Sequence, residues 1–447
     1  MLYSINPAIV LSMVPIKSYI KRRQQLASQM QKGIAIIPTS PERVRNRDCN
    51  HPYRFDSYFY YLTGFDEPDA LFVMILGGDI NETKAILFCQ DKDIEHEIWN
   101  GFRYGPESAK EVFSIDEAYP ISSVDEVLPK LLAGQSRIYY SLGQDAAWDL
   151  RFTGWLNQVR EKSRSGLSTP TEIYDSRTLI DEMRLFKSTE ELQLMRRAAE
   201  ISSRAHCRAM QATHPGMKEY EVEAEFLYEF RKHGAEAPAY TPIVAGGANA
   251  CVLHYVKNNM ELKSGDLVLI DAGCELNGYA ADITRTFPVN GKFSSVQKDV
   301  YQLVLSAQSA AINTVQPGNS WDMPHTAALQ VLVQGFIDMG LCQGSVDSVI
   351  ESEDYRRFYM HRTGHWLGLD VHDVGEYKQD GKWRLFDSGM ALTVEPGCYI
   401  RPAENVPEHF WNIGVRIEDD VIVTNTGCEV LTVSAPKSVD EIEELMR

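Results

Sequence analysis

The 447-residue sequence has few cysteines, and they lie far apart. Its eight cysteines form no Cys-x-x-Cys pair, which argues against a thiolate zinc site and against a dense disulfide framework. We therefore expect reduced, mostly buried thiols, in line with a cytoplasmic compartment.

Positive charge and long apolar runs are also scarce. Lysine and arginine number 44 against 62 acidic residues, a formal net charge of −18, so we expect no nucleic-acid or anionic-membrane partner. No apolar stretch reaches the length of a membrane span. The N-terminal "MLYSINPAIVLSMVPIKSYIKRRQQ" carries its basic cluster after the apolar patch, the reverse of a signal peptide. A mitochondrial presequence stays open, because acidic residues are absent there.

The length predicts two domains, and the mixture of strand and helix patterns favours the α/β class. Alternating short strands and helices are expected in the first half, and the stretch 164–177 reads as an inter-domain connection. Ser188 with Glu191 three residues later is a capping-box pattern, so a second domain is expected to begin at residue 185. The clearest strands of the first domain are expected at 70–76, 84–89 and 137–142.

The second domain carries a faint internal repeat. "HPGMKEYEVEAEFLYEFRKHG" (214–234) resembles "QPGNSWDMPHTAALQVLVQGFIDMG" (316–340), and each reads as Pro-Gly, a helix and a terminating glycine. "SGDLVLIDAG" (264–273) resembles "SGMALTVEPG" (388–397). The repeat therefore pairs Asp271 with Glu395, each at the end of a buried strand.

A hairpin is predicted after Asp271, because Asn277-Gly278 is a turn signal. A two-residue loop places Gly273 opposite Asp282, whereas a four-residue loop places Asp271 opposite Asp282. Either register puts the two aspartates on one face as direct or diagonal neighbours. The hairpin alone leaves open that one aspartate is exposed and the other caps a turn.

The second copy of the hairpin adds two more acids. Glu395 ends "MALTVE", and "GVRIEDDVIVT" (414–424) supplies Glu418 in a return strand. Four converging carboxylates in a half-buried site need about four positive charges, which two divalent cations supply. An oxygen-rich donor set favours hard ions such as Mn²⁺, and two such ions share a bridging water and polarise a carbonyl.

A histidine-rich segment, "MHRTGHWLGLDVHDVG" (360–375), supplies a candidate fifth ligand. His361 and His365 have the spacing of a zincin helix, but Arg362 replaces the required glutamate and Gly364 interrupts the helix, so we reject that interpretation. One imidazole ligand with two neighbouring histidines fits the segment better. A structural role for any single histidine stays open.

The motifs "DLVLIDAG…GYAADITRTFPVNGKF", "HWLGLDVHDVG", "TVEPG" and "VRIEDDV" resemble those of aminopeptidase P, the Xaa-Pro aminopeptidase family. "YYLTGFDEP" (60–68) and "EMRLFKS" (182–188) are similar to its N-terminal domain and its inter-domain junction. The resemblance covers nearly the whole chain. It implies an extension at 1–12, a mixed α/β N-terminal domain at 13–184 and a pita-bread catalytic domain at 185–447.

The resemblance also implies roles for individual residues. Asp282 and Glu418 bridge two metal ions, Asp271 and His365 lie at opposite ends, and Glu395 is both a ligand and the proton shuttle. The ions are expected to be Mn²⁺, with Zn²⁺ or Co²⁺ as substitutes in vitro. Around them the resemblance places residues that orient substrate or line the proline pocket: His254, His361, His372, Tyr399, Arg416 and, from a neighbouring subunit of a dimer or tetramer, Trp99.

The implied reaction is attack of a metal-bridging hydroxide on the bond before proline, which releases the N-terminal residue of Xaa-Pro peptides. Two alternatives stay open. A prolidase has the same fold and metals but acts on Xaa-Pro dipeptides. A binding module with this fold holds peptides without metals, and its ligand positions are degenerate, whereas all five are intact here.

Overall fold

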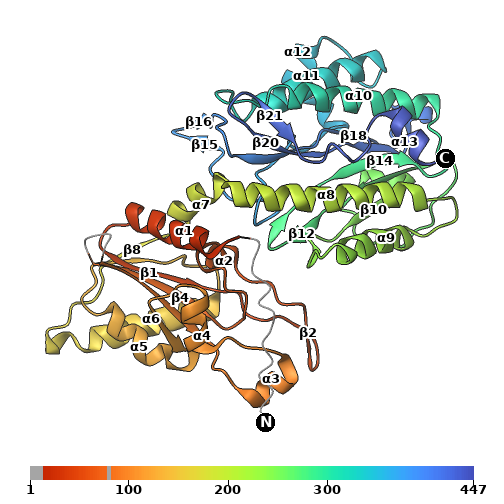
Figure 1. The fold of residues 1–447 in the computed structure, drawn as a ribbon. Helices are drawn as coiled ribbons and strands as arrows, with labels where there is room; N and C mark the ends of the chain where they lie inside the picture. Colours follow the sequence, from red (N-terminus) through yellow and green to blue (C-terminus); the bar gives the residue numbers. More distant parts are fainter. Residues whose placement is uncertain (1–13, 78–81) are drawn as a thin grey trace. The chain divides into compact units, whose positions relative to one another are not determined.

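The computed structural model describes residues 14–77 and 82–447, and the expected extension at 1–12 lies outside these residues. The chain divides into two compact units, residues 1–183 and 184–447 (Figure 1). Both contain helices and strands, so the α/β class is confirmed. Within the described residues, no helix is long and apolar enough to cross a membrane.

The N-terminal unit is built on a mixed six-stranded sheet. Antiparallel pairs join β1 to β4 and β4 to β5, and the outer pairs are parallel. A short hairpin, β2 (Val44–Asn46) with β3 (Cys49–Asn50), stands apart. In spatial order the sheet strands are β6 (Glu117–Pro120), β5 (Thr83–Cys89), β4 (Leu71–Leu76), β1 (Gly33–Pro38), β7 (Arg137–Tyr139) and β8 (Glu172–Tyr174).

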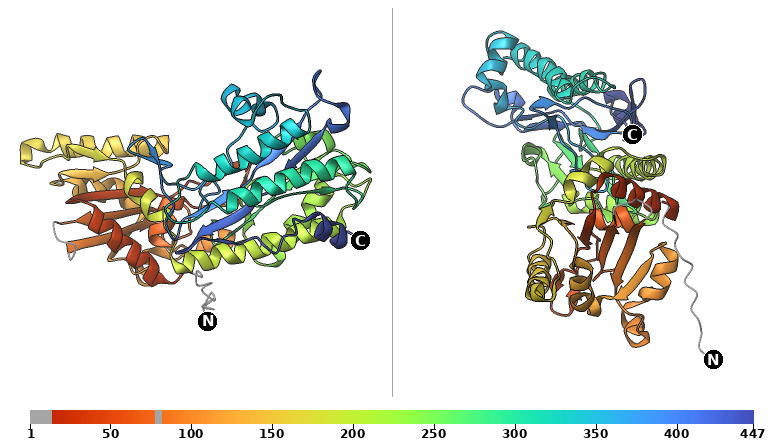
Figure 2. Two further views of the ribbon diagram at one scale, coloured as in Figure 1. Left: turned by 90° about the horizontal axis from the view of Figure 1, so that it is seen from above. Right: turned by 90° about the vertical axis from the view of Figure 1, so that its left-hand side faces the viewer.

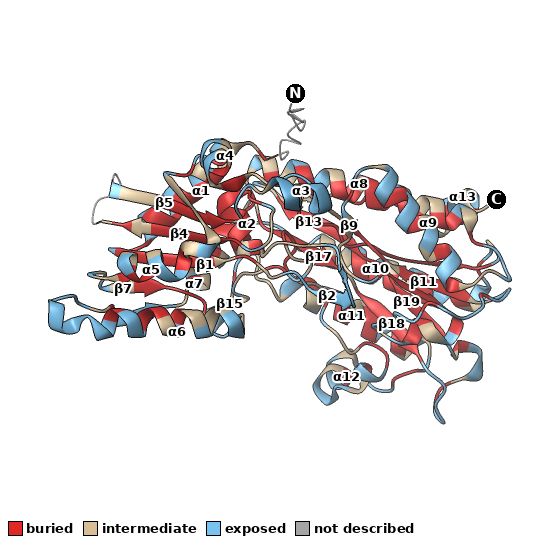
Figure 3. Ribbon diagram, turned by 90° about the horizontal axis from the view of Figure 1, so that it is seen from below, coloured by how far each residue is buried: buried red, intermediate tan, exposed pale blue. Residues whose placement is uncertain are grey.

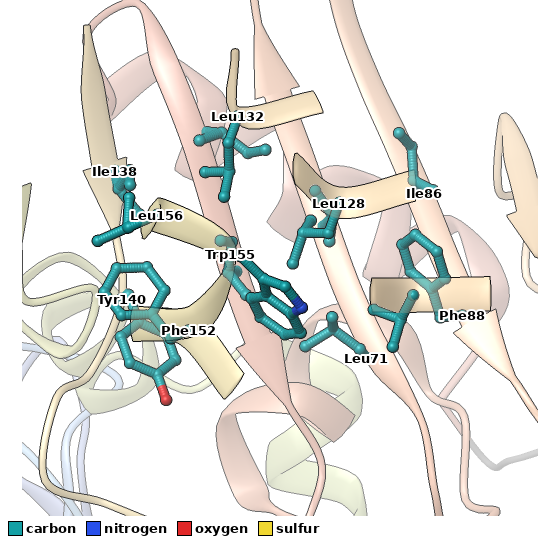
Figure 4. Close-up of a cluster of buried hydrophobic side chains, with 14 of the residues drawn as sticks. Leu71, Ile86, Phe88, Leu128, Leu132, Ile138, Tyr140, Phe152, Trp155 and Leu156 are labelled. Atoms are coloured by element: carbon teal, nitrogen blue, oxygen red, sulfur yellow. The ribbon is translucent and has the colours of Figure 1, made fainter. Parts of the chain in front are cut away.

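The core of this unit lies between the sheet and two helices. Trp155, Phe152 and Leu128 of the helices form one buried cluster with Ile86 and Ile138 of the strands (Figure 4). Burying such large apolar side chains is the main source of stability in a sheet-and-helix layer. The helices are α1 (Ile16–Gln29), α2 (Ser57–Thr63), α3 (Ile94–Asn100), α4 (Gly105–Val112), α5 (Val124–Leu132), α6 (Ala146–Glu161) and α7 (Arg177–Leu185).

The strands predicted at 70–76, 84–89 and 137–142 are present as β4, β5 and β7, the last of which is shorter than expected. The prediction for 164–177 is wrong in part. Residues Glu172–Tyr174 form β8, which pairs with β7 at the edge of the sheet. The run "EIY" has β-branched and aromatic residues that suit a strand. The serine, threonine and proline just before it are typical of loops, and they led to the prediction of a connection.

The C-terminal unit combines long helices with antiparallel strands, and the helices run along the strands (Figure 2). The predicted capping box is confirmed at the start of α8, where Ser188 and Glu191 exchange hydrogen bonds. The helices are α8 (Thr189–Ala212), α9 (Glu219–Lys232), α10 (Ser295–Ile312), α11 (Met323–Asp338), α12 (Val346–Ser352) and α13 (Val439–Leu445).

The strands of this unit form several small sheets, and their central members are buried (Figure 3). One sheet joins β10 (Ile243–Gly246), β11 (Leu267–Asp271) and β14 (Thr284–Pro288), and another joins β17 (Ala391–Val394), β20 (Asp419–Val423) and β21 (Cys428–Val430). The remaining strands are β9 (Ala237–Pro238), β12 (Cys274–Leu276), β13 (Tyr279–Ala280), β15 (Lys378–Gln379), β16 (Lys382–Trp383), β18 (Gly397–Ile400) and β19 (Ile413–Arg416).

The internal repeat expected from the sequence is present. Each copy contributes a helix after its Pro-Gly turn, α9 in one and α11 in the other. Each also contributes a buried strand that leads to an acid: β11 ends at Asp271, and β17 ends one residue before Glu395. The two acids therefore occupy matching places in the two halves of the unit.

Candidate active site

The first hairpin takes the tighter of the two expected registers. Leu276 pairs with Tyr279, so the loop is the two residues Asn277-Gly278. Both have positive φ, 51° and 80°, as a type I′ turn requires. The same register continues to the pair of Asp271 with Thr284.

Gly273 therefore lies across from Asp282, and this close approach requires glycine. A Cβ atom at Gly273 would lie 1.7 Å from the carbonyl oxygen of Ala281. The two aspartates are diagonal neighbours on one face, and neither is an exposed turn residue. The exposed fractions of their side chains are 13% for Asp271 and 7% for Asp282.

The second hairpin brings its two glutamates together more directly. Val394 pairs with Asp419 in β17 and β20, and Gly397 pairs with Arg416 in β18 and β19. This shared register sets Glu395 opposite Glu418. The repeat is thus imperfect: Glu418 occupies the place that Thr284 takes in the first copy, and Arg416 the place of Asp282.

All five predicted ligands line one cavity of about 630 Å³. Ligand atoms of Asp282, His365 and Glu418 lie within 4.8 Å of one another, close enough to hold one ion. Asp271 and Glu395 line the same cavity outside this tightest group. The donor set of four carboxylates and one imidazole fits hard divalent cations.

His365 presents the correct nitrogen to the acids. Its Nδ1 lies 3.0 Å from the carbonyl oxygen of Trp366, so Nδ1–H donates there and Nε2 is the ring nitrogen that faces the acids. That Nε2 lies 3.4 Å from Asp282 Oδ2 and 3.8 Å from Glu395 Oε1. The segment that holds His361 and His365 is not helical, so the rejection of a zincin helix is confirmed.

Burial and mutual repulsion make the acids costly to ionise together. Burial raises the pKa of Asp271, raises that of Glu418 strongly, and raises that of Glu395 to about 7. Burial is the largest single effect on Asp282 and opposes its ionisation too, but the hydrogen bond and charge of His365, with Tyr240 and Arg416, together outweigh burial and lower the pKa. Bound cations would favour the ionised form of all four acids and offset their negative charge.

Two residues that sequence reasoning missed hold the acids in place. The Tyr240 hydroxyl lies 2.5 Å from both Asp271 Oδ1 and Asp282 Oδ1. Thr284 Oγ1 donates to Glu418 Oε2 at 2.7 Å. Tyr240 lies in a loop with no repeat or motif around it, whereas Thr284 could have been found from its place two residues after Asp282 in the return strand.

Arg416 connects the acids to a second group of side chains. Its Nη2 donates to Asp271 at 2.6 Å and its Nη1 to the Tyr399 hydroxyl at 3.0 Å. Tyr399 in turn lies 2.8 Å from Nε2 of His361. Burial, followed by the charge of Arg416, lowers the pKa of His361 to about 3. Arg416, Tyr399 and the neutral ring of His361 thus form a hydrogen-bonded wall beside the acids.

The other predicted residues fall in two places. His254 and His372 line the cavity, and the rings of His372 and His365 lie 4.2 Å apart between centroids. His254 is solvent-exposed, so it is no core histidine. Trp99 lies in the N-terminal unit with 86% of its side chain exposed, and its role stays a prediction.

Two family patterns match the chain. Metallopeptidase family M24 matches residues 193–425, and the aminopeptidase P N-terminal domain matches residues 19–139. The chain is 45% identical to the Xaa-Pro aminopeptidase of Escherichia coli K12, over 98% of this chain and 99% of the relative. It is 35% identical to mouse Xaa-Pro aminopeptidase 3, over 96% of this chain and 85% of the relative.

Solved structures agree with these matches. The aminopeptidase PepP of Pseudomonas aeruginosa has a TM-score of 0.95 and 50% identity, with 97% of this chain and 98% of that chain covered. Zn-substituted Escherichia coli aminopeptidase P in complex with product has a TM-score of 0.95 and 45% identity, with 97% and 98% covered. These neighbours confirm the fold class that the sequence predicted for both domains.

Proposed function

This chain belongs to metallopeptidase family M24, and we propose that it is a two-metal Xaa-Pro aminopeptidase that releases the N-terminal residue from peptides with proline in second position. The family and the Xaa-Pro aminopeptidase type rest on identity over nearly the full chain. The observation that supports the assigned residues best is the convergence of four carboxylates and His365 on one cavity.

We assign the metal ligands to residues of both hairpins. Asp282 and Glu418 would be shared by the two ions, Asp271 and His365 would each serve one of them, and Glu395 would complete the set. The oxygen-rich donors favour Mn²⁺ as the physiological ion. When bound, the two ions lower the pKa of a water, polarise the substrate carbonyl and bind the free N-terminal amine.

The side chains then handle protons and orientation. Glu395 accepts the proton of the attacking water and returns it to the proline nitrogen as the C–N bond breaks. His372 and His254 orient the substrate and donate to the oxygen that gains charge as the carbonyl becomes tetrahedral. The peptide nitrogen of proline carries no hydrogen, so the site must recognise the ring itself. His361, Tyr399 and Arg416 are assigned to that pocket.

The prolidase alternative is not favoured, because the close relatives are Xaa-Pro aminopeptidases. The metal-free binding module is disfavoured by the intact ligand set. The deciding experiment compares kcat/KM of the Mn²⁺-loaded protein on one Xaa-Pro dipeptide, the matching Xaa-Pro-Yaa peptides and Xaa-Ala-Yaa.

We expect faster release of Xaa from the tripeptide and longer peptides than from the dipeptide, and little cleavage of Xaa-Ala-Yaa. A prolidase must bind the free proline carboxylate, and a site built around such a polar group strongly rejects substrates that lack it. A marked preference for the dipeptide would reassign the protein to prolidase. Efficient cleavage of Xaa-Ala-Yaa would remove the proline-specific interpretation.

We also propose a homo-oligomer, a dimer or tetramer, in which Trp99 lines a neighbouring subunit's site. Trp99 and Ile98 are both strongly exposed on α3, which favours a protein contact there. Light scattering of the wild type and of Trp99→Ala tests this. A cytoplasmic location is proposed because the eight cysteines are all free, and fractionation of cells tests it.

A further inference from the structure

A second cavity shares the segment His361–Arg362 with the catalytic one. It has a volume of about 520 Å³, and both of these residues line the two cavities. Its other walls come from α11 through His325 and from the residues after α12, including Glu353 and Arg356. We call it the adjoining cavity.

The wall between the two cavities is held rigidly. The Tyr359 hydroxyl lies 2.6 Å from Thr363 Oγ1, and His325 Nδ1 lies 2.9 Å from the same oxygen. His361 Nδ1 donates to the Arg362 carbonyl at 2.7 Å. The backbone that carries Arg362 is therefore fixed beside the residues assigned to the proline pocket.

The charged residues that line the adjoining cavity carry more positive than negative charge. Glu353 pairs with Arg356 at 2.8 Å, which leaves Arg362 as the excess positive charge. Within the described parts of the chain, the Arg362 side chain makes no hydrogen bond or ion pair. Its guanidinium carbon lies 5.0 Å from the Trp383 ring, a contact that orients the group and leaves its donors available.

His325 adds no charge at neutral pH. Burial, followed by the charges of Arg362 and Arg356, lowers its pKa to about 4. The neutral His325 and the exposed, unpaired guanidinium of Arg362 form a polar surface that suits a carboxylate. The planar guanidinium can donate two parallel N–H hydrogen bonds to the two carboxylate oxygens.

A substrate that fills the catalytic cavity must continue past it. The proline ring is assigned to His361, Tyr399 and Arg416, and each further residue extends the chain by roughly 3.6 Å at most. Since His361 lines both cavities, a peptide leaving the proline pocket along this wall meets Arg362 next.

We propose that the adjoining cavity receives the peptide beyond proline and that Arg362 binds a carboxylate there. The carboxylate is the side chain of an acidic residue after proline or the free C-terminus of a short peptide. This inference rests on the proposed function, because it takes the proline pocket as the starting point. It makes Arg362 a residue that determines which Xaa-Pro peptides are preferred.

Two matched peptide pairs separate the two sources of the carboxylate. Ala-Pro-Glu-NH₂ against Ala-Pro-Gln-NH₂ tests the side chain, and Ala-Pro-Gln with a free C-terminus against its amide tests the terminus. Each pair is measured on the wild type, Arg362→Gln, Arg362→Lys and Arg357→Gln. Arg357 is the control, because it is an exposed arginine nearby that lines neither cavity.

We expect the wild type to prefer the carboxylate in at least one pair, by roughly threefold in kcat/KM as for an exposed ion pair. The preference should lie mainly in KM and weaken at high salt. Arg362→Gln should abolish it, Arg362→Lys should retain part of it, and Arg357→Gln should keep it.

Equal cleavage within both pairs by the wild type would overturn the inference, and so would a preference that survives in Arg362→Gln. Failure to cleave any of the three peptides would instead contradict the proposed function. The two failures are therefore distinguishable in one data set.

Discussion

Glu395 and Glu418 face each other across neighbouring strands, in the register set by the Val394–Asp419 and Gly397–Arg416 pairs. Like charges directly opposite in a sheet are destabilising, and here two aspartates share the same cavity. A fold that keeps four acids together at this cost indicates a functional site. Bound cations would remove the repulsion between the acids.

The first prediction concerns the metal. Chelated protein should lose peptidase activity and regain it with Mn²⁺. Asp282→Ala removes a proposed bridging ligand, so the variant should bind less metal and lose nearly all hydrolysis while it stays folded. Metal content by mass spectrometry, activity and circular dichroism measure the three properties together.

Asp299→Ala is the matched control, because Asp299 is an exposed carboxylate on α10 outside the catalytic cavity. It should keep both metal and activity. Near-normal turnover by Asp282→Ala would contradict the two-metal assignment.

The second prediction separates the neighbouring histidines. His365→Ala should empty the site of metal, because its Nε2 points at Asp282 and Glu395. His372→Ala should keep the metal and lose roughly 10- to 100-fold in rate, the usual loss for a residue just outside the ligands. Loss of metal in His372→Ala would show that the ligand had been assigned to the wrong histidine.

The hairpins and their acids were predictable because the signals are local. Asn277-Gly278 selects a type I′ turn, and strand alternation then fixes which side chains share a face. The sequence left two registers open, and the close approach of Gly273 to the Ala281 carbonyl goes with the tighter one.

Contacts made by isolated residues could not be predicted in the same way. Tyr240 reaches Asp271 and Asp282 from a loop, and no periodicity points to it. Glu219, in the first turn of α9, binds a loop that lies far from it in the sequence. The sequence alone would explain this acid by its place at a helix start, where the helix dipole favours negative charge. Such long-range partners are set by how the elements pack.

The third prediction concerns Glu219, which is fully buried. Its Oε1 accepts from the Gly246 amide and Asn249, and its Oε2 accepts from Tyr255 and the Met260 amide, all at 2.7–3.0 Å. These bonds hold the loop 246–260, which carries His254.

Glu219→Gln replaces an acceptor oxygen by an NH₂ group, so at least one of the four donors loses its partner, at a cost of about 1–3 kcal/mol. We expect a lower free energy of unfolding and a lower kcat, with metal content unchanged because Glu219 contacts no proposed ligand. Glu225→Gln on the same helix breaks only a partly exposed pair with Arg208 and should change each property little. Equal kcat values for the two variants would show that the loop does not need Glu219.

The last prediction concerns pH and His206, which is buried completely in α8. Its Nε2 lies 3.0 Å from the carbonyl oxygen of Ala272. Burial, followed by the charge of Arg285, lowers its pKa from the ordinary 6.5 to about 3. As the pH falls below 6.5, the unfolded chain binds a proton at this residue and the folded chain does not, so the free energy of unfolding decreases until the pH nears 3.

Between pH 7 and pH 5 this one residue should therefore remove about 2 kcal/mol of stability. In His206→Gln that part of the pH dependence is absent, so the drop in the free energy of unfolding over this interval should be smaller by about 2 kcal/mol. Urea titrations with chelator present at both pH values measure the difference without metal release. His214→Gln, at an exposed histidine, should show the wild-type drop. A His206→Gln protein with the same drop as the wild type would mean that His206 binds its proton equally well in the folded and unfolded chains.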